Sequence, residues 1–333
     1  MTCHQIGGRL VTMMSETYTP RFNGLIGQDK AKKKLNFYID SYEKAGLIPN
    51  LLFTAPKGCG KTMMATALAK ELKKDGETKP KRYLEVNCST LKNVKKFFDE
   101  FIIPSVNDRD VTVLFDEASE IPQDVEMAML TILNPNPDNR TSFSWDDYTF
   151  NFDFRRQTFL FATSEPHKVF HALKDRLDRV DLEEYNYEEL GKIVLINLPE
   201  VNFEDGLLEE IATVLRGNAR AAQKMSIKIQ MYLDFKGGNT FLRRDWNSLL
   251  DTLGIAPLGL RAKEIEILHV LNNSRDCSLT RLGSKTGMTP EALRRDYELY
   301  LMNQDLMEIS TAGRNITKVG KDYLKALELA EAA

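Results

Sequence analysis

Ala55-Pro56-Lys57-Gly58-Cys59-Gly60-Lys61-Thr62 is the stretch that decides the fold of this 333-residue chain. An apolar run over residues 50–54 precedes it, and Met64, Leu68 and Leu72 follow at helical spacing. The pattern predicts a strand, a glycine-rich loop and a helix. Backbone N–H groups in such a loop, together with the start of the helix, attract an anion. The sequence therefore predicts a phosphate-binding loop.

The residues of this loop suit the binding of ATP and magnesium. Lys61 is expected to pair with the terminal phosphates and Thr62 to hold Mg²⁺. The strict pattern has glycine where Ala55 stands, so a glycine-rich turn followed by Lys and Thr by accident is the alternative. The strand before the loop and the helix after it favour phosphate binding. The residues expected to surround the phosphates are Gly58, Cys59 and Gly60.

Two carboxylates end a second apolar run, residues 111–115. Asp116 is expected to help hold magnesium, and Glu117 to orient and deprotonate the attacking water. On its own, a strand that runs into an acidic turn is the simpler interpretation. Because a phosphate loop lies in the same domain, the catalytic interpretation of the two carboxylates is favoured.

A third apolar run, residues 159–162, ends in Thr163 and Ser164, whose hydroxyls suit positioning of the water. Further on, Arg176 is predicted to reach the nucleotide of a neighbouring subunit, and Arg220 to be another cation for the phosphates. Each of these residues alone also fits a solvated arginine or a capping threonine. Their order along the chain favours the functional interpretation.

Length and pattern predict several domains. Residues 1–17 are expected to form a flexible arm, and residues 18–184 an α/β domain whose apolar runs alternate with helices as in a parallel sheet. Residues 185–252 predict a small helical domain. Residues 253–333 predict a winged helix, with helices over 263–272, 279–286 and 290–302 before two short strands.

Composition excludes several classes of protein. The chain is 42% hydrophobic and 28% charged, with a formal net charge of -3, so any binding to nucleic acid has to be local. No window suits a membrane span, and the start lacks the pattern of a signal peptide, so a cytoplasmic location is expected. The four scattered cysteines predict neither a disulfide nor a structural metal.

The chain resembles the AAA+ ATPases, and more closely the RuvB-like family that drives branch migration of Holliday junctions. The resemblance covers nearly all of the chain from Tyr18 onward. It implies a phosphate-loop domain with a parallel sheet, a helical lid and a C-terminal winged helix. The stretches that carry it, besides the phosphate loop, are 22–28 at the adenine pocket, 185–190 at the entry to the lid, 216–220, 253–260, and 311–314 at the wing tip.

The resemblance also implies a homo-hexameric ring in which neighbouring subunits share each ATP site. Lys61, Thr62, Asp116, Glu117 and Thr163 would come from one subunit and Arg176 from the next. The residues that the resemblance adds to the nucleotide site are Ile26 and Tyr185 at the base, with Arg220 as a sensor of the phosphates.

One segment departs from the family. The residues from Phe143 to Phe154 alternate as a hairpin around a short acidic turn, Asp146-Asp147, where the family has a long apolar tip that engages RuvA. A RuvA-like or other junction-targeting protein could bind the aromatic face. Alternatively, this face packs on its own domain. This departure indicates a divergent member of the family.

DNA contacts are predicted on the winged helix. Arg294 and Arg295 lie on the expected recognition helix and Arg314 at the wing tip, where cations suit phosphate contacts of any sequence. The alternative is that this module packs against protein.

The leading hypothesis is thus a DNA-dependent ATPase that translocates duplex DNA at four-way junctions in recombination and repair. An AAA+ clamp or helicase loader acting on replication complexes is the alternative. Intact Lys61, Glu117 and Arg176 argue against a third class, a scaffold without turnover.

Overall fold

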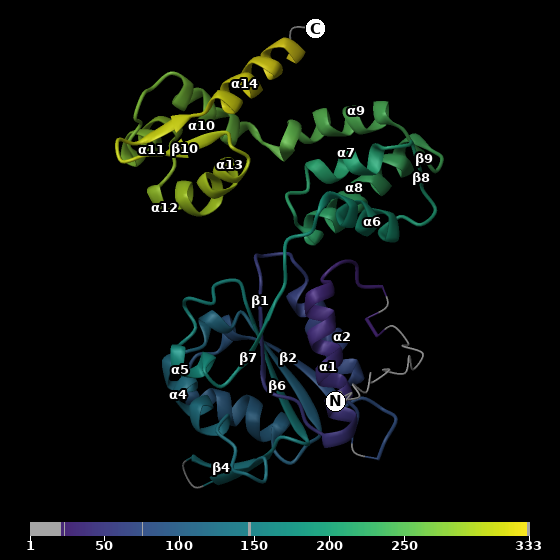
Figure 1. Ribbon diagram of the computed structural model, residues 1–333, viewed down its shortest axis with the longest axis vertical. Coiled ribbons are helices and arrows are strands. Elements are labelled where there is room, and N and C mark those ends of the chain that lie inside the picture. Colours follow the sequence, from purple (N-terminus) through teal and green to yellow (C-terminus); the bar gives the residue numbers. More distant parts are fainter. Residues whose placement is uncertain (1–20, 23, 75, 146–147, 332–333) are drawn as a thin grey trace, which may run out of the picture. The chain divides into compact units, whose positions relative to one another are not determined.

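A computed structural model describes residues 21–22, 24–74, 76–145 and 148–331. The chain forms two compact units, one ending at Glu184 and the other starting at Tyr185 (Figure 1). The predicted arm, residues 1–17, and the hairpin turn at 146–147 lie outside the described residues.

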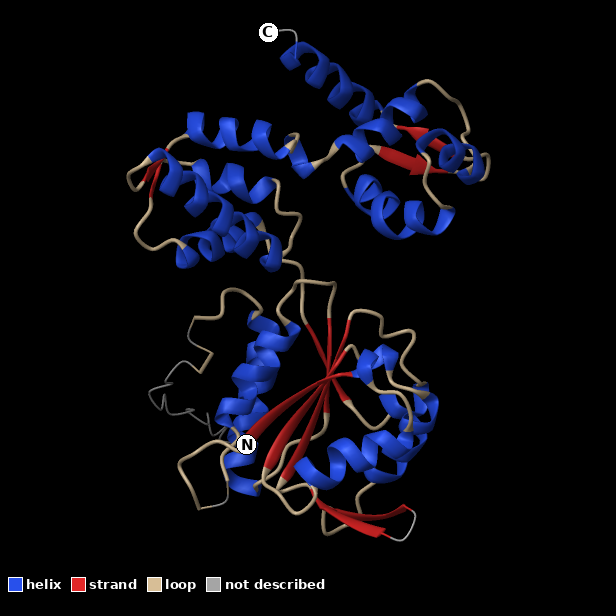
Figure 2. Ribbon diagram, turned by 180° about the vertical axis from the view of Figure 1, so that it is seen from behind, coloured by secondary structure: helices blue, strands red, loops and turns tan. Residues whose placement is uncertain are grey.

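A five-stranded parallel sheet forms the centre of the first unit, in the order β2-β3-β6-β1-β7. The central strands are apolar on both faces, which requires cover on both sides. The helices provide this cover: α1 and α2 lie on one side of the sheet, and α4 and α5 on the other (Figures 1 and 2). The strands are β1 (Leu51–Thr54), β2 (Arg82–Asn87), β3 (Val111–Asp116), β6 (Gln157–Thr163) and β7 (Asp178–Asp181).

The helices of this unit bury apolar side chains against the sheet. Met64, Leu68 and Leu72 are buried, as the spacing after the phosphate loop predicted. The helices are α1 (Asp29–Ala45), α2 (Lys61–Glu71), η1 (Cys88–Thr90), α3 (Val94–Lys96), the π-helical η2 (Phe97–Val106), η3 (Ala118–Glu120), α4 (Gln123–Ile132) and α5 (His171–Lys174).

An antiparallel hairpin of β4 (Arg140–Trp145) and β5 (Tyr148–Asp153) covers part of this core. Three of its aromatic side chains stack around Phe98, with ring centroids 5.0 Å away for Phe143, 5.5 Å for Trp145 and 5.3 Å for Phe150. Phe98 is fully buried. Of the two interpretations left open by the sequence, packing on the domain is therefore the one observed. These aromatic side chains do not form a free docking face.

The second unit begins with a helical bundle that has its own apolar core. A capping box between Asn186 and Glu189 starts its first helix. The sequence pattern missed a short parallel pair, β8 (Asn202–Phe203) with β9 (Thr240–Phe241), because two residues carry no periodic signal. The helices are α6 (Tyr187–Asn197), α7 (Leu207–Thr213), α8 (Ala219–Lys236) and α9 (Arg243–Leu253).

A separate apolar core lies in the rest of this unit, where the winged helix was predicted. Three helical segments precede a two-stranded antiparallel wing and a final helix. The elements are η4 (Pro257–Gly259), α10 (Ala262–Asn272), α11 (Leu279–Thr286), α12 (Pro290–Ala292) continued by the π-helical η5 (Leu293–Glu298) and by α13 (Leu299–Asn303), then β10 (Met307–Ile309), β11 (Arg314–Ile316) and α14 (Lys318–Glu331).

Within the described residues, no helix has the length and apolar character needed to cross a membrane.

Candidate ATP site

The phosphate loop joins β1 to α2 at the carboxyl edge of the sheet. Gly58 and Gly60 have φ of 84° and 88°, in the left-handed region that glycine adopts without a steric cost. Lys61 begins α2, and its Nζ donates hydrogen bonds to the carbonyls of Ala55 (2.9 Å) and Pro56 (3.1 Å). The loop therefore has the backbone conformation that phosphate binding requires, and the side chain of Lys61 is hydrogen-bonded to the start of the same loop.

Cys59 is a structural member of this loop. Its side chain is buried, and burial, with a smaller contribution from Glu184, raises the pKa of the thiol to about 11. The thiol is therefore protonated near neutral pH and is a poor nucleophile. A phosphate contact from Cys59 would come through its backbone.

The folded chain joins the predicted magnesium ligands directly. Thr62 Oγ1 donates a hydrogen bond of 2.9 Å to Asp116 Oδ2, although 54 positions separate these residues in the sequence. The other carboxylate oxygen, Oδ1, accepts from the backbone N–H of Glu117 at 2.9 Å. Because Mg²⁺ prefers oxygen ligands and completes its shell with phosphates and water, this hydroxyl and carboxylate fit such an ion.

Glu117 follows in a strained conformation. Its φ of 55° and ψ of 48° are left-handed, which is uncommon for a residue with a side chain. The residue is exposed, so its carboxylate is accessible to water. An exposed carboxylate beside a magnesium-type oxygen pair suits the predicted role of a base.

The structure does not support the role predicted for Thr163. Its side chain is 1% exposed, and its hydroxyl donates to Ser119 Oγ (3.2 Å) and accepts from the N–H of Glu165 (2.9 Å). These bonds occupy the hydroxyl inside the protein. Ser164 is only half-buried, and its hydroxyl has no hydrogen-bond partner within the described residues. Of the two hydroxyls, Ser164 is the one available to a ligand.

Arg176 lies just after α5 and is held by two backbone carbonyls. Its Nε donates to Leu130 O (3.0 Å) and its Nη1 to Ala172 O (2.7 Å), while Nη2 makes no hydrogen bond within the described part of the chain. The side chain is partly exposed. A guanidinium fixed in this way, with donors to spare, is oriented for an external anion.

The remaining predicted nucleotide residues are divided between the two units. Ile26 is half-buried in the segment before α1. Gln28 attaches that segment to Glu183, with Nε2 donating to the Glu183 carbonyl (2.7 Å) and Oε1 accepting its N–H (2.9 Å). In the second unit, the N–H of Tyr185 donates to Gly217 O (3.1 Å), and Arg220 is exposed in the first turn of α8.

The predicted DNA cations differ in availability. Arg294 and Arg295 are exposed, and Arg295 pairs with Asp296 at 2.7 Å. The wing-tip role of Arg314 is wrong, because this residue lies in β11 and its side chain is 11% exposed. Its guanidinium pairs with the carboxylate of Glu298, which is 4% exposed. Arg314 therefore stabilises the domain rather than facing phosphate.

Arg275 was not among the predicted DNA contacts. It is exposed and lies on the turn that packs against the wing, where Cys277 and Arg314 exchange backbone hydrogen bonds of 3.0 Å. The sequence shows a basic residue at this position, but it does not show the tertiary pairing that places this turn beside the wing.

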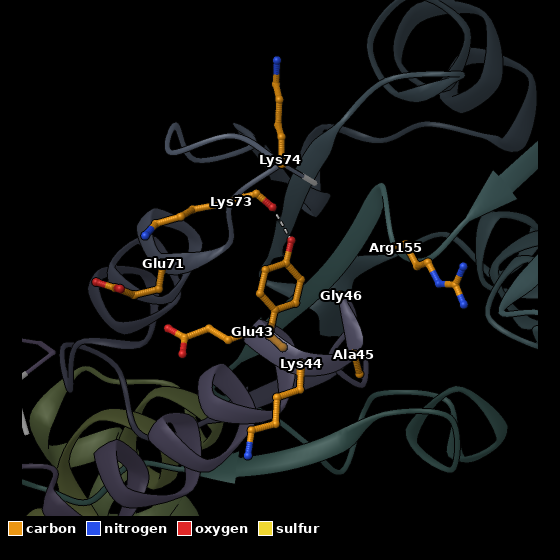
Figure 3. A pocket seen from close by; sticks show the side chains of 10 residues that line it. Glu43, Lys44, Ala45, Gly46, Glu71, Lys73, Lys74 and Arg155 are labelled. Atoms are coloured by element: carbon orange, nitrogen blue, oxygen red, sulfur yellow. Dashed lines mark hydrogen bonds between the residues drawn. The ribbon is translucent and has the colours of Figure 1, made fainter. Parts of the chain in front are cut away.

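A hollow of 440 Å³ lies beside Tyr42, away from the phosphate loop. Lys44, Lys74 and Arg155 line it but point in different directions (Figure 3). The buried Lys81 lies 5.0 Å from the centroid of the Tyr42 ring and donates to Arg155 O at 2.6 Å. Burial lowers the pKa of Lys81 to about 8. The lining groups do not converge, so this hollow is not a competing active site.

Two family models match the chain. Residues 51–185 match the ATPase family associated with various cellular activities (AAA), and residues 257–325 match the RuvB C-terminal winged helix domain. This chain is a RuvB-like AAA+ protein. As a member of this group it is an ATP hydrolase, and the winged-helix match separates it from the loader alternative.

Relatives of similar length match most of the chain. The Holliday junction branch migration complex subunit RuvB of Sulfurimonas denitrificans is 25% identical over 311 residues, covering 89% of this chain and 87% of that protein. The protein of the same name from Ehrlichia ruminantium is 26% identical over 310 residues, covering 90% and 89%. The RuvB Holliday junction branch migration motor of Thermotoga maritima shares the fold, with a TM-score of 0.71 and 21% identity over 90% of this chain and 95% of that one. The predicted AAA+ and winged-helix fold is confirmed.

Proposed function

We propose that this RuvB-like chain is an ATP-driven motor that moves duplex DNA and drives branch migration of four-way junctions in recombination and repair. The observation that carries the proposal is the hydrogen bond between Thr62 and Asp116 in a chain that also ends in a RuvB-type winged helix. An ATP site and a DNA-binding module in one chain are the two parts that a DNA motor needs. Relatives named as subunits of a branch migration complex support the choice of junction DNA.

The ATP chemistry follows from the residues gathered at the sheet edge. Backbone N–H groups of the loop and Lys61 bind the phosphates, and Thr62 with Asp116 would hold Mg²⁺. Such an ion supplies neutralisation of phosphate charge when bound. Glu117 accepts the proton of the attacking water, and Ser164 positions that water by a hydrogen bond.

Hydrolysis in this proposal requires a neighbouring subunit. Arg176 is held by the carbonyls of Leu130 and Ala172 and keeps donors for an anion. An arginine supplied by a neighbour stabilises charge in the transition state, so that turnover depends on assembly. A hexameric ring of identical chains would give each ATP site such an arginine, while Arg220 senses the phosphates from the lid.

DNA is held by phosphate contacts from the second unit. Arg294 and Arg295 on the helix that includes η5 remain the proposed contacts, and Arg275 replaces Arg314 beside the wing. A motor that moves along any sequence has to bind the backbone rather than base edges.

A junction-targeting partner, if one binds the hairpin, meets its polar outer face. Exposed Ser142 bonds to Asn151 there at 2.7 Å, and exposed Ser144 to Thr149 at 3.1 Å. That contact would differ in kind from the apolar tip that is typical of the family.

The test is ATP-dependent dissociation of a synthetic four-way junction by the purified protein, with Lys61→Ala as the matched control. Dissociation that requires ATP and is absent from the control supports the motor. ATP hydrolysis stimulated by duplex DNA, without dissociation in the presence or absence of a RuvA-type protein, contradicts it.

A further inference from the structure

A basic hollow lies in the second unit where α8 meets the chain leading into α10. Its volume is 270 Å³. Among its lining residues four are cationic and none is acidic: Arg216, Lys224, Lys228 and Arg261. A concave surface lined by one sign of charge attracts the opposite charge.

A buried carboxylate fixes the two sides of this hollow relative to one another. Glu264 is 4% exposed, and its oxygens accept hydrogen bonds from Arg216 Nη1 (2.7 Å) and Nη2 (2.8 Å). The same carboxylate accepts the backbone N–H of Arg261 at 2.8 Å. Bidentate arginine pairs are strongly directional, so Glu264 holds Arg261 in a fixed position relative to the lid.

Three further contacts hold the two sides of the hollow together. The guanidinium of Arg216 also donates to the Gly259 carbonyl and lies 4.1 Å from the centroid of the Tyr300 ring. Gly259 has a φ of 71°, and a Cβ there would come within 2.5 Å of the Val214 carbonyl. The backbones approach so closely that only glycine fits. The hollow is therefore built into the fold rather than formed by surface side chains alone.

The charge of the hollow is not balanced from within. Glu264 compensates Arg216. Lys224, Lys228 and Arg261 have no side-chain ion pair within the described residues, and Lys224 and Arg261 are exposed. Three positive charges thus remain for a ligand, and lysine and arginine are the side chains that bind phosphate groups in proteins.

We propose that the basic hollow binds the phosphodiester backbone of DNA as a contact separate from the recognition helix. This inference rests on the proposed function, which supplies DNA as the partner. From residue 253 onward acidic and basic residues are equal in number, and Arg314 is committed to Glu298. The winged helix by itself therefore has little excess positive charge, and the lysines of α8 provide what it lacks. This need favours nucleic acid over an acidic protein surface.

The experiment compares duplex binding by the full chain and by the triple variant Lys224→Gln, Lys228→Gln, Arg261→Gln over a range of KCl concentrations. The plot of log affinity against log salt should become shallower by roughly one to three, because each lost phosphate contact removes about 0.9 from the slope. The matched control removes the same charge from α14 by Lys318→Gln, Lys321→Gln, Lys325→Gln, all exposed residues of the same unit. It should keep the parental slope.

The outcomes separate this inference from the proposed motor function. A parental slope in the hollow variant overturns the inference even if the parent dissociates junctions. If the hollow variant has a shallower slope than the parent, but the parent itself does not dissociate junctions, the result supports DNA binding in the hollow and contradicts the proposed motor function. If the hollow variant keeps the slope but loses self-assembly in light scattering, acidic groups of another chain occupy the hollow, and the DNA proposal is wrong. Circular dichroism melting verifies that each variant is folded.

Discussion

Replacing Arg216 by methionine tests most directly whether the ion pair with Glu264 stabilises the connection between the helical lid and the winged helix. The substitution leaves Glu264, which is 4% exposed, with a buried charge that has lost its cationic partner. Breaking a buried ion pair on one side costs about 3–5 kcal/mol. Because Arg216 is 27% exposed, we expect the lower end of this range, about 3 kcal/mol, including roughly 0.5–1 kcal/mol for the contact with Tyr300.

Two further variants identify the origin of this loss. Arg216→Met combined with Glu264→Leu removes both charges and should unfold closer to the parent than Arg216→Met alone, since no charge is left unpaired. The unfolding free energy of Glu264→Gln should lie between those of Arg216→Met and the double variant, because an amide oxygen still accepts from the Arg261 N–H.

Urea unfolding followed by tryptophan fluorescence measures these differences. Trp246 is 3% exposed in the lid core, so a Trp145→Phe background makes fluorescence report on the second unit alone. The reasoning is refuted if Arg216→Met unfolds at the parental urea midpoint. It is refuted equally if the double variant is no more stable than Arg216→Met, because the cost would then not come from a stranded carboxylate.

Other predictions concern the first unit. Phe98→Ala should lower its unfolding free energy by about 3–5 kcal/mol, measured in urea, since the ring is fully buried under three hairpin aromatics. Lys81 has a folded pKa of about 8 against 10.5, so its amine binds more protons in the unfolded chain between these values and its contribution to stability rises with pH. From about pH 7.5 to 9.5, the unfolding free energy of the parent should rise by about 2 kcal/mol relative to that of Lys81→Met; the same pH dependence in both proteins contradicts the prediction. Arg176→Ala should retain nucleotide affinity while steady-state hydrolysis falls on the order of 10³-fold. Unchanged turnover would exclude a shared ATP site.

The fold followed from patterns that are local in the sequence. The apolar runs at β1, β3 and β6 are long enough and uniform enough to indicate strands buried on both faces. The loop before Lys61 and the carboxylates after β3 then placed two halves of one site at the same sheet edge. Parallel topology makes this inference safe, because the carboxyl ends of adjacent parallel strands lie together.

Side-chain availability was not predictable in the same way. Thr163 and Ser164 are adjacent and chemically alike, and the hydroxyl of Thr163 is the occupied one because Ser119 and the Glu165 N–H lie beside it in the fold. Arg314 looks like a free cation in sequence, because its partner Glu298 is 16 positions away on another element. Such contacts depend on tertiary packing, which a linear pattern does not encode.

Because the backbone at Glu117 is left-handed, thermostability and ATP turnover favour different residues at this position. Glycine would adopt φ of 55° without strain, so Glu117→Gly should raise the melting temperature while removing the proposed base. A selection of variants of this chain for heat resistance alone is therefore expected to enrich those with glycine at position 117, which are inactive. Any programme that engineers it for stability has to score ATP hydrolysis in the same round.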